Sequence, residues 1–242
     1  MRICYKEYDM GEERIVRKML FEDIEGLSNA FVEQGWPERK DILHKYFHEQ
    51  EVGERQVLVA LVGRFLAGYI TVIPSANHGP FAGLYPELTD FNVFESFQRQ
   101  GIGTALIEKA EQEALLKHQE VIFQYPFYWY NMPAILKHWF DEVFTYQFAY
   151  GSQGDKLKGK YFIPSFTVGA PESEYHTLGE HHFKVYEFCK NLAQTAYYAQ
   201  MKYVEPLYFH GTSVNAGYTK EDIEAKAKAQ AQRLLAFLSS LK

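Results

Sequence analysis

The chain has 242 residues, of which 47% are hydrophobic and 23% are charged, and its formal net charge at pH 7 is −6. This length allows one large domain or two small ones, and the apolar content excludes a globally disordered chain. The acidic balance argues against nucleic-acid and anionic-membrane binders, because both usually need a basic face. Cys4 and Cys189 alone cannot build a disulfide framework, and no apolar run forms a signal core or reaches the roughly 20 residues of a membrane helix. We therefore expect a cytoplasmic protein without membrane insertion.

Apolar periodicity in the first part of the chain predicts strands that alternate with helices. The expected elements are a strand at 14–20, helices at 21–31 and 41–50, and strands at Gln56–Val62, Phe65–Ile73 and 88–94. Gly63 and Arg64 form a short hairpin turn between two of these strands, and Asp41 is expected to cap the second helix. His44 and His48 are spaced for a metal on that helix, but no third ligand accompanies them, so we expect solvated side chains.

A glycine turn between a strand and a helix follows this region. It consists of Gln98, Arg99, Gln100, Gly101, Ile102, Gly103 and Thr104. Glycines let the backbone approach an anion, while successive N–H groups and the helix N-terminus supply positive partial charge. Arg99 would add a full positive charge. The segment therefore predicts a phosphate site, and the alternative is a plain strand-to-helix turn that uses two glycines.

The order of strand, two helices, hairpin, strand, Q-x-x-G-x-G loop and helix resembles the GNAT N-acetyltransferase family over about residues 12–114. The resemblance implies that the glycine loop holds the pyrophosphate of acetyl-CoA. It also implies that one strand runs beside the pantetheine arm, with the residues Asp90, Phe91, Asn92 and Val93. The alternative for these side chains is simple packing within a sheet. The next strand, helix and closing hairpin of that family have no match in this chain.

Aromatic residues are concentrated after residue 120, since 12 of the 28 residues at 123–150 are aromatic. An apolar strand at 121–123 runs into an aromatic loop that contains prolines, and a helix with Trp139 and Phe140 follows. Aromatic side chains at the carboxyl end of a strand suit a planar ligand, because ligands of open α/β sheets bind at those ends. The alternative is an aromatic core, which explains the helix better than the loop.

The remaining chain continues the alternation of strands and helices. A second strand within 158–171 ends in a loop of small residues, and a helix at 183–199 and a strand at 203–210 follow. Cys189 lies in the apolar pattern of that helix and is expected to be buried and inert. Thr219 is expected to cap a closing amphipathic helix. The apolar stripe of this helix comprises Ile223, Ala227, Ala231, Leu234, Leu235 and Leu238.

This second half resembles the flavodoxin-like NAD(P)H:quinone oxidoreductase family, including its potassium-efflux ancillary members, over about residues 111–242. FQYPFYWYNMPAILKHWFDEVF is similar to the flavin-binding segment of that family, and QFAYG to its dimer-contact segment. TVGAPESEYHTLGEHHF is similar to its second flavin and substrate loop. The resemblance implies FMN or FAD as cofactor, NAD(P)H as hydride donor, a quinone-like acceptor and a homodimer.

The resemblance also implies roles for particular residues. The residues expected to line the flavin ring, mostly through backbone groups, are Pro126, Phe127, Tyr128, Trp129, Tyr130, Asn131, Thr167, Val168, Gly169 and Ala170. Tyr175 and His181 match a catalytic pair that stabilises charge on the flavin. His176 and His182 are close by and remain alternatives for the histidine. Hydride transfer itself is flavin chemistry, which the protein orients and tunes.

The two resemblances meet in one helix at 107–117, with no linker between them. We predict an α/β protein in which a partial GNAT-like mixed sheet is joined to a partial flavodoxin-like parallel sheet with flanking helices. The predicted domains are an incomplete acetyltransferase module at 1–110 and a quinone oxidoreductase module at 111–242 that lacks its first two strands. Both sheets would have an open edge. The edges could pair into one composite sheet, partner chains could complete them, or the chain could record a recombination or deletion.

Three functions follow from these observations. The first is a flavin-dependent NAD(P)H oxidoreductase, which has the longer and more specific resemblance. The second is an acetyl-CoA-dependent N-acetyltransferase. The third is a non-catalytic or regulatory protein.

Overall fold

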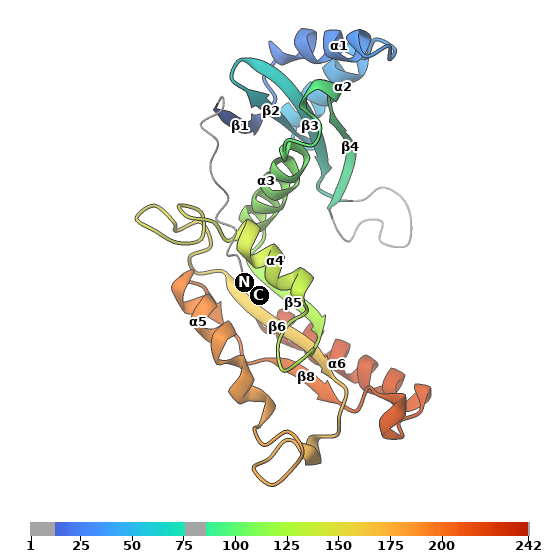
Figure 1. Ribbon diagram of the computed structural model, residues 1–242, viewed down its shortest axis with the longest axis vertical. Helices are drawn as coiled ribbons and strands as arrows, with labels where there is room; N and C mark the ends of the chain where they lie inside the picture. The colour runs from blue at the N-terminus through green and yellow to red at the C-terminus, as the bar shows by residue number, and fades with distance from the viewer. Residues whose placement is uncertain (1–12, 76–85, 242) are drawn as a thin grey trace. The chain divides into compact units, whose positions relative to one another are not determined.

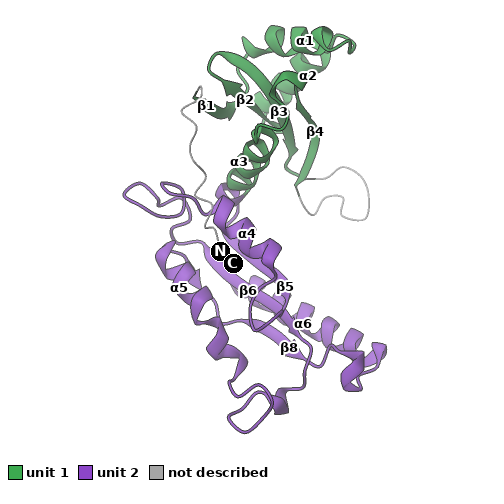
Figure 2. Ribbon diagram, viewed as in Figure 1, with its two compact units in different colours: residues 1–114 green, residues 115–242 purple. Residues whose placement is uncertain are grey.

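The computed structural model describes residues 13–75 and 86–241 of the chain (Figure 1). Cys4 and most of the loop that precedes β4 lie outside these residues. The chain divides into two compact units, residues 1–114 and 115–242 (Figure 2). The predicted fold class is confirmed, because an antiparallel sheet in unit 1 is followed by a parallel sheet in unit 2.

Unit 1 is built on four antiparallel strands in the order β1-β2-β3-β4. Its elements are β1 Arg14–Lys18, α1 Asp23–Glu33, α2 Lys40–Glu51, β2 Gln56–Val62, β3 Phe65–Ile73, β4 Glu87–Val93, the short 3-10 helix η1 Glu95–Phe97 and α3 Ile102–Lys117. Successive side chains of a strand point to opposite faces. Val57 and Val59 of β2 pack with α1 and α2, while Leu58 and Ala60 pack with the buried face of α3. Coverage on both faces explains why β2 is apolar throughout.

Unit 2 is built on parallel strands, with β6 between β5 on one side and both β7 and β8 on the other. Its elements are β5 Glu120–Pro126, α4 Ala134–Val143, β6 Tyr161–Val168, the 3-10 helices η2 Glu172–Glu174 and η3 Val185–Cys189, α5 Lys190–Tyr198, β7 Lys202–Tyr203, β8 Leu207–His210, the 3-10 helix η4 Val214–Ala216 and α6 Lys220–Ser240. Phe123 and Phe162 of the sheet pack against Phe140 of α4, and Leu192 of α5 belongs to the same core.

Several predicted details of the sheets differ from the structure. The composite-sheet hypothesis is wrong, because the described strands form two separate sheets. The sheet of unit 1, expected to be mixed, is antiparallel in each of its described pairings. The strand predicted at 203–210 is split into β7 and β8, with Pro206 between them, because proline cannot donate to a ladder.

The helix predictions also need correction. Asp41 does not cap α2, which begins at Lys40 without a side-chain cap. The helix predicted at 183–199 begins as the 3-10 helix η3 and becomes α-helical only at Lys190. Thr219 does cap α6 and accepts a hydrogen bond from the backbone N–H of Asp222 at 3.1 Å.

The apolar stripe of α6 is only partly covered. This helix packs mainly against β8, so its predicted apolar stripe is largely open and Leu235 is 63% exposed. The buried residue of the helix is Gln230, whose amide reaches Ser165 of β6 at 3.4 Å. Within the described strands β5 pairs with β6 alone, which leaves its outer edge open, as the sequence predicted.

Candidate functional site at the carboxyl ends of the parallel strands

Three loops of unit 2 meet at the carboxyl ends of β5, β6 and β8. The backbone N–H of Phe127 donates to the carbonyl of Thr167 at 2.9 Å, which joins the first loop to the second. The backbone N–H of Thr212 donates to the carbonyl of Val168 at 3.2 Å, which joins the loop after β8. Ligands of parallel α/β sheets bind outside these ends, so the three loops frame a candidate site.

The first loop is a tight turn. Tyr128 and Asn131 exchange two backbone hydrogen bonds of 2.9 Å, while Trp129 and Tyr130 between them have φ of 46° and 62°. Two successive positive φ values are typical of a type I′ turn and are costly for residues other than glycine. The turn leaves Trp129 92% exposed. The aromatic loop therefore presents its rings to a ligand or partner rather than to the core.

Tyr175 and His181 lie against each other in the loop that follows β6. Their ring centroids are 4.3 Å apart with 24° between the planes, and burial raises the pKa of Tyr175. The hydroxyl of Tyr130 lies 3.2 Å from Nδ1 of His181, while the Nε2 atom of His181 is buried without a hydrogen-bond partner among the described residues. The exposed His176 and His182 do not stack on Tyr175, so the geometry selects His181 from the three neighbours.

His210 is a member of this site that sequence reasoning missed. Its Nδ1 donates to the carbonyl of Ala170 at 3.2 Å, and its ring lies 5.1 Å from that of Tyr175. Burial lowers the pKa of His210. Its own carbonyl accepts from Lys226 of α6 at 3.0 Å. The available signal was its position, because His210 ends a predicted strand at the same edge of the sheet as the other loops.

The predicted flavin residues divide into two groups. Phe127 and Val168 turn into the core, where Phe127 stacks on Phe166 at 5.3 Å, so only their backbone can face a ligand. The exposed members are Pro126, Tyr128, Trp129, Tyr130 and Asn131, and the half-buried ones are Thr167, Gly169 and Ala170. The side chain of Asn131 points away from the histidines, since its Oδ1 accepts from Asn191 of α5 at 3.2 Å.

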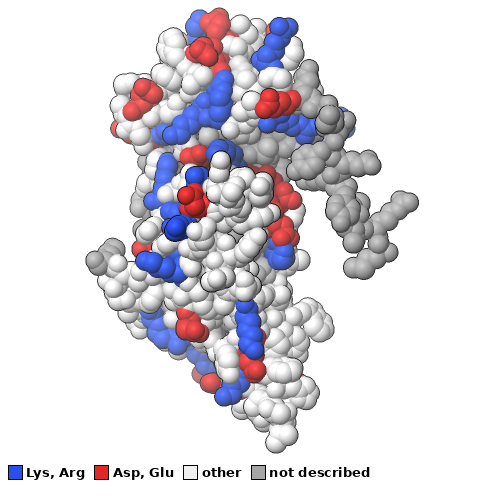
Figure 3. Space-filling view, turned by 90° about the vertical axis from the view of Figure 1, so that its left-hand side faces the viewer, with Lys and Arg blue, Asp and Glu red and all other residues white. Residues whose placement is uncertain are grey.

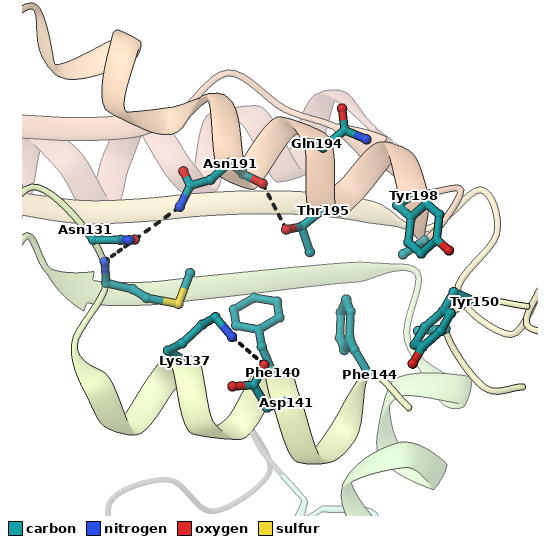
Figure 4. A pocket seen from close by; sticks show the side chains of 13 residues that line it. Asn131, Lys137, Phe140, Asp141, Phe144, Tyr150, Asn191, Gln194, Thr195 and Tyr198 are labelled. Carbon is teal, nitrogen blue, oxygen red and sulfur yellow. Dashed lines mark hydrogen bonds and ion pairs between the residues drawn. The ribbon is translucent and has the colours of Figure 1, made fainter. Parts of the chain in front are cut away.

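A cavity of about 460 Å³ extends from Asn131 between α4 and α5 (Figure 4). Phe140 and Phe144 line it from α4, and Tyr150 and Tyr198 face each other at one end, with ring centroids 5.6 Å apart. The cavity therefore has an aromatic lining next to the turn that carries the candidate ring contacts.

Contacts within unit 1 account for several residues of the glycine turn. The amide of Gln98 donates to the carbonyl of Val93 at 3.0 Å, and Gln100 donates to the carbonyl of Ser96 at 2.9 Å. Gly101 has φ of 79°, and a Cβ on Gly103 would lie 3.1 Å from the ring of Phe91. Conformation and packing thus explain the two glycines. Of the remaining members, Ile102 is a buried residue of α3, Thr104 is an exposed residue of the same helix, and Arg99 is exposed in the turn before it.

The strand β4 contributes a charge pair to unit 1. Arg39 donates to both oxygens of Asp90 at 3.0 and 2.7 Å, and the hydroxyl of Tyr46 donates to the same carboxylate at 2.9 Å. Burial would raise the pKa of Asp90, but these hydrogen bonds outweigh it and hold the pKa below its ordinary value. Two residues further on, Oδ1 of Asn92 is buried without a partner among the described residues. Asp90 is therefore held as a carboxylate by its neighbours.

Other kinds of site find less support. The described part of the chain contains no group of three or more His, Cys, Asp or Glu placed to hold a metal ion. No described helix is long and apolar enough to cross a bilayer. On the face drawn in Figure 3, positive and negative side chains are interspersed between uncharged areas. Cys189 is buried, as expected, and burial raises the pKa of its thiol to about 11, which disfavours the reactive thiolate.

Comparison with known families gives two matches. A sequence model of the flavodoxin-like fold matches residues 78–235, and one of the acetyltransferase (GNAT) domain matches residues 27–124. Both resemblances expected from the sequence are thereby confirmed. The two matches overlap at residues 78–124, and this overlap includes the helix that the sequence assigned to both families.

Individual relatives agree with the first match. The chain is 38% identical over 119 residues to the uncharacterized NAD(P)H oxidoreductase YdeQ of Bacillus subtilis, covering 49% of this chain and 58% of that protein. It is 38% identical to the uncharacterized NAD(P)H oxidoreductase YrkL of the same organism, covering 55% and 72%. A solved structure of general stress protein 14 from Treponema denticola in complex with FMN is 34% identical, with a TM-score of 0.47 and coverage of 55% and 72%. This chain thus spans less than two thirds of YdeQ.

Proposed function

Because this chain belongs to the flavodoxin-like fold family, we propose that unit 2 is a flavin-dependent NAD(P)H oxidoreductase that transfers hydride to a quinone-like acceptor. The observation that carries the proposal is the contact of Tyr130 and Tyr175, from the loops after β5 and β6, with His181, whose buried Nε2 has no hydrogen-bond partner among the described residues. Two curated relatives named NAD(P)H oxidoreductase and a relative solved with FMN support the same chemistry. A bound flavin would supply the hydride chemistry, and the protein would supply binding, orientation and charge.

The donor set suits an isoalloxazine ring. Such a ring carries carbonyl oxygens and acceptor nitrogens along one edge, and a buried N–H without a partner is costly unless a ligand fills it. His181 Nε2 is an atom of this kind. Tyr175, stacked on His181 and buried, would shield that hydrogen bond from water. The exposed aromatic turn would contribute ring surface for stacking.

The flavin phosphate would need contacts other than those of the ring. Unit 2 starts its sheet at β5, so it lacks the earlier strand and loop that the resemblance leads us to expect at the flavin phosphate. We therefore expect the ring to dominate binding, with riboflavin, FMN and FAD taken up with similar affinity.

The test is the visible absorption of the purified protein during titration with FMN, then with NADPH under anaerobic conditions, and then with a quinone. The proposal predicts a protein-bound flavin band that NADPH bleaches and the quinone restores. The variant His181→Leu is expected to slow bleaching at least about tenfold, since it removes a polar group from the reacting edge. His182→Leu is the matched control, because that neighbour is exposed. A protein that takes up no flavin would contradict the proposal.

We also infer that a second copy of the chain covers the mouth of the cavity between α4 and α5. Large exposed apolar side chains surround this region, namely Ile135, Tyr146, Tyr197 and Tyr198. Exposed patches of this kind mark interaction sites in soluble proteins. A homodimer is expected in analytical ultracentrifugation, and Ile135→Glu is expected to dissociate it. A monomer at every concentration would contradict this inference.

Acetyl-CoA binding by unit 1 is the second candidate function. It is favoured by the match of the acetyltransferase domain and by the buried Oδ1 of Asn92 on the strand expected beside pantetheine. The pyrophosphate would lie at the start of α3, beside Arg99. Calorimetric titration with coenzyme A tests it, and Arg99→Ala is expected to weaken the binding. Absence of any heat of binding would rule it out.

A further inference from the structure

The aromatic turn and the catalytic pair are connected by one hydrogen bond between residues far apart in the sequence. The hydroxyl of Tyr130 lies 3.2 Å from Nδ1 of His181. The ring of Tyr130 is held by stacking on Phe188, with centroids 5.0 Å apart and 25° between the planes. Stacking on Phe188 holds one face of the ring, and its hydroxyl is directed at one nitrogen of the imidazole.

The direction of this hydrogen bond follows from the chemistry of the two groups. A phenol is a better donor than acceptor, and the nitrogen of a neutral imidazole without hydrogen is a strong acceptor. When Tyr130 is the donor to Nδ1, the single imidazole proton lies on Nε2, because the tautomer is set by the hydrogen bond of the other nitrogen. Nε2 is buried without a hydrogen-bond partner among the described residues. In this tautomer His181 therefore presents a donor that a ligand could satisfy.

His210, on the other side of Tyr175, provides an internal contrast. Its Nδ1 lies 3.2 Å from the carbonyl of Ala170, and a carbonyl can only accept. The proton of neutral His210 is therefore on Nδ1, opposite to the tautomer derived for His181. Both rings lie against Tyr175, with centroids at 4.3 and 5.1 Å, and they differ in the partner of Nδ1, a hydroxyl for His181 and a carbonyl for His210.

We propose that Tyr130 is a positioning residue that holds His181 in the Nε2–H tautomer, so that Nε2 donates to an acceptor atom on the edge of the bound flavin. This inference rests on the proposed function, and it adds a role for the hydroxyl of Tyr130 beyond ring contact. Without that hydroxyl, His181 can place its proton on either nitrogen, and the fraction that presents a donor to the site falls.

The first experiment uses the full chain without flavin, so it does not depend on the oxidoreductase activity. Proton–nitrogen correlation spectra of protein with ¹⁵N-labelled histidine report the tautomer of each ring, and His181→Gln and His210→Asn assign the two signals. We expect Nε2–H for His181 and Nδ1–H for His210. In Tyr130→Phe, His181 is expected to show averaged tautomers while His210 stays unchanged. Tyr186→Phe, an exposed tyrosine of η3, is the control. An Nδ1–H tautomer for His181, or no change in Tyr130→Phe, would overturn the proposal.

The second experiment measures FMN affinity and the rate of flavin bleaching by NADPH in a double-mutant cycle. Tyr130→Phe is expected to weaken one or both by about three- to tenfold, the range for losing a neutral hydrogen bond. In the His181→Gln background the amide nitrogen supplies a donor that has no tautomer, so Tyr130→Phe is expected to have no further effect. An equal loss in both backgrounds would mean that Tyr130 acts through its own ligand contact, which overturns the proposal. Failure to take up any flavin would overturn the proposed function, while the spectra without flavin would still decide the tautomer.

Discussion

The loops that follow β4 and β5 both connect a strand to a helix, but the fold uses their side chains differently. In unit 1, the amides of Gln98 and Gln100 bond to carbonyls four or five residues earlier. In unit 2, the hydroxyl of Tyr130 reaches His181, 51 residues later, and the backbone N–H of Phe127 donates to Thr167 at the end of β6. In the first loop the glutamine side chains bond locally and one backbone carbonyl, that of Gln100, accepts from Arg14 of β1 at 2.8 Å, whereas in the second an aromatic side chain contacts the candidate catalytic histidine.

This difference bears on whether a sequence motif marks a ligand site. The glycines that suggest a phosphate loop in unit 1 are explained by a positive φ at Gly101 and by packing of Gly103 on Phe91. In unit 2, the buried Nε2 of His181 lacks a partner, although stacking and hydrogen bonds fix the ring that carries it. A group held in place at an energetic cost is better evidence of function than a pattern that local geometry already requires.

The largest effect on stability is expected from a substitution at Gly211, directly after β8. Gly211 has φ of 79°, and a Cβ there would lie 2.4 Å from Tyr218 and 2.6 Å from Lys226. Gly211→Ala is expected to lower the free energy of unfolding of unit 2 by about 3 kcal/mol, combining backbone strain with overpacking. Gly217→Ala shares the positive φ but meets no atom within 4 Å, so it is expected to cost about 1 kcal/mol. Denaturant titration followed by hydrogen exchange measures both, and equal losses would contradict the packing at Gly211.

The second prediction concerns the charge pair of unit 1. Arg39→Ala leaves the half-buried Asp90 without its bidentate partner and is expected to cost about 2 kcal/mol, between the values for exposed and fully buried pairs. Hydrogen exchange of the β2 amides reports the loss. Arg64→Ala, at the exposed hairpin turn, is the control and is expected to change stability by less than about 0.5 kcal/mol.

The pH dependence of this pair has a definite sign. Because the folded pKa of Asp90 lies below its ordinary value, its stabilisation is present above the unfolded pKa of about 3.9 and is lost as the pH falls through the folded value. Arg39→Ala is expected to flatten the acid limb of the stability curve of unit 1. An unchanged acid limb would show that Asp90 does not contribute to it.

The sequence predicts the fold well where local patterns decide it. The continuous apolar run of β2 and the Gly63 turn define β2 and β3 at the residues where the structure has them. The apolar stripe of α6 was predicted from periodicity alone, and the structure adds that this helix packs mainly against β8. Amphipathicity thus identifies a helix without showing what covers it.

The candidate site shows the same limit. The aromatic turn and the Tyr175–His181 pair can be identified from resemblance to a family. The choice among three neighbouring histidines, the bond from Tyr130 and the participation of His210 depend on contacts between residues far apart in sequence. No local pattern contains that information, because these contacts exist only once β5, β6 and β8 lie in register.

The third prediction tests the hydrogen bond between His210 and the carbonyl of Ala170, which are far apart in the sequence. His210→Leu removes the side-chain donor to Ala170 and is expected to weaken flavin binding by about tenfold, since the Ala170 carbonyl next to the ring site keeps only the backbone N–H of Gly211 as partner among the described residues. His210→Asn can restore a donor at the position of Nδ1 and is expected to recover most of the affinity. Visible absorption titrations measure both variants. Equal weakening by the two substitutions would show that ring packing on Tyr175, rather than the hydrogen bond, is what the site requires.

The smallest effect is expected for the local hydrogen bond of Gln98 in the loop after β4. Gln98→Ala removes an exposed hydrogen bond to Val93 and is expected to change the stability of unit 1 by less than about 0.5 kcal/mol. It is expected to leave flavin affinity and the NADPH reaction unchanged, because neither Gln98 nor its partner belongs to unit 2. Calorimetric titration of Gln98→Ala with coenzyme A then shows whether Gln98 contributes to ligand binding by unit 1. If Gln98→Ala abolished coenzyme A binding while stability stayed the same, the loop would be recognising a ligand as well as closing on itself, and the contrast between the two loops would fail.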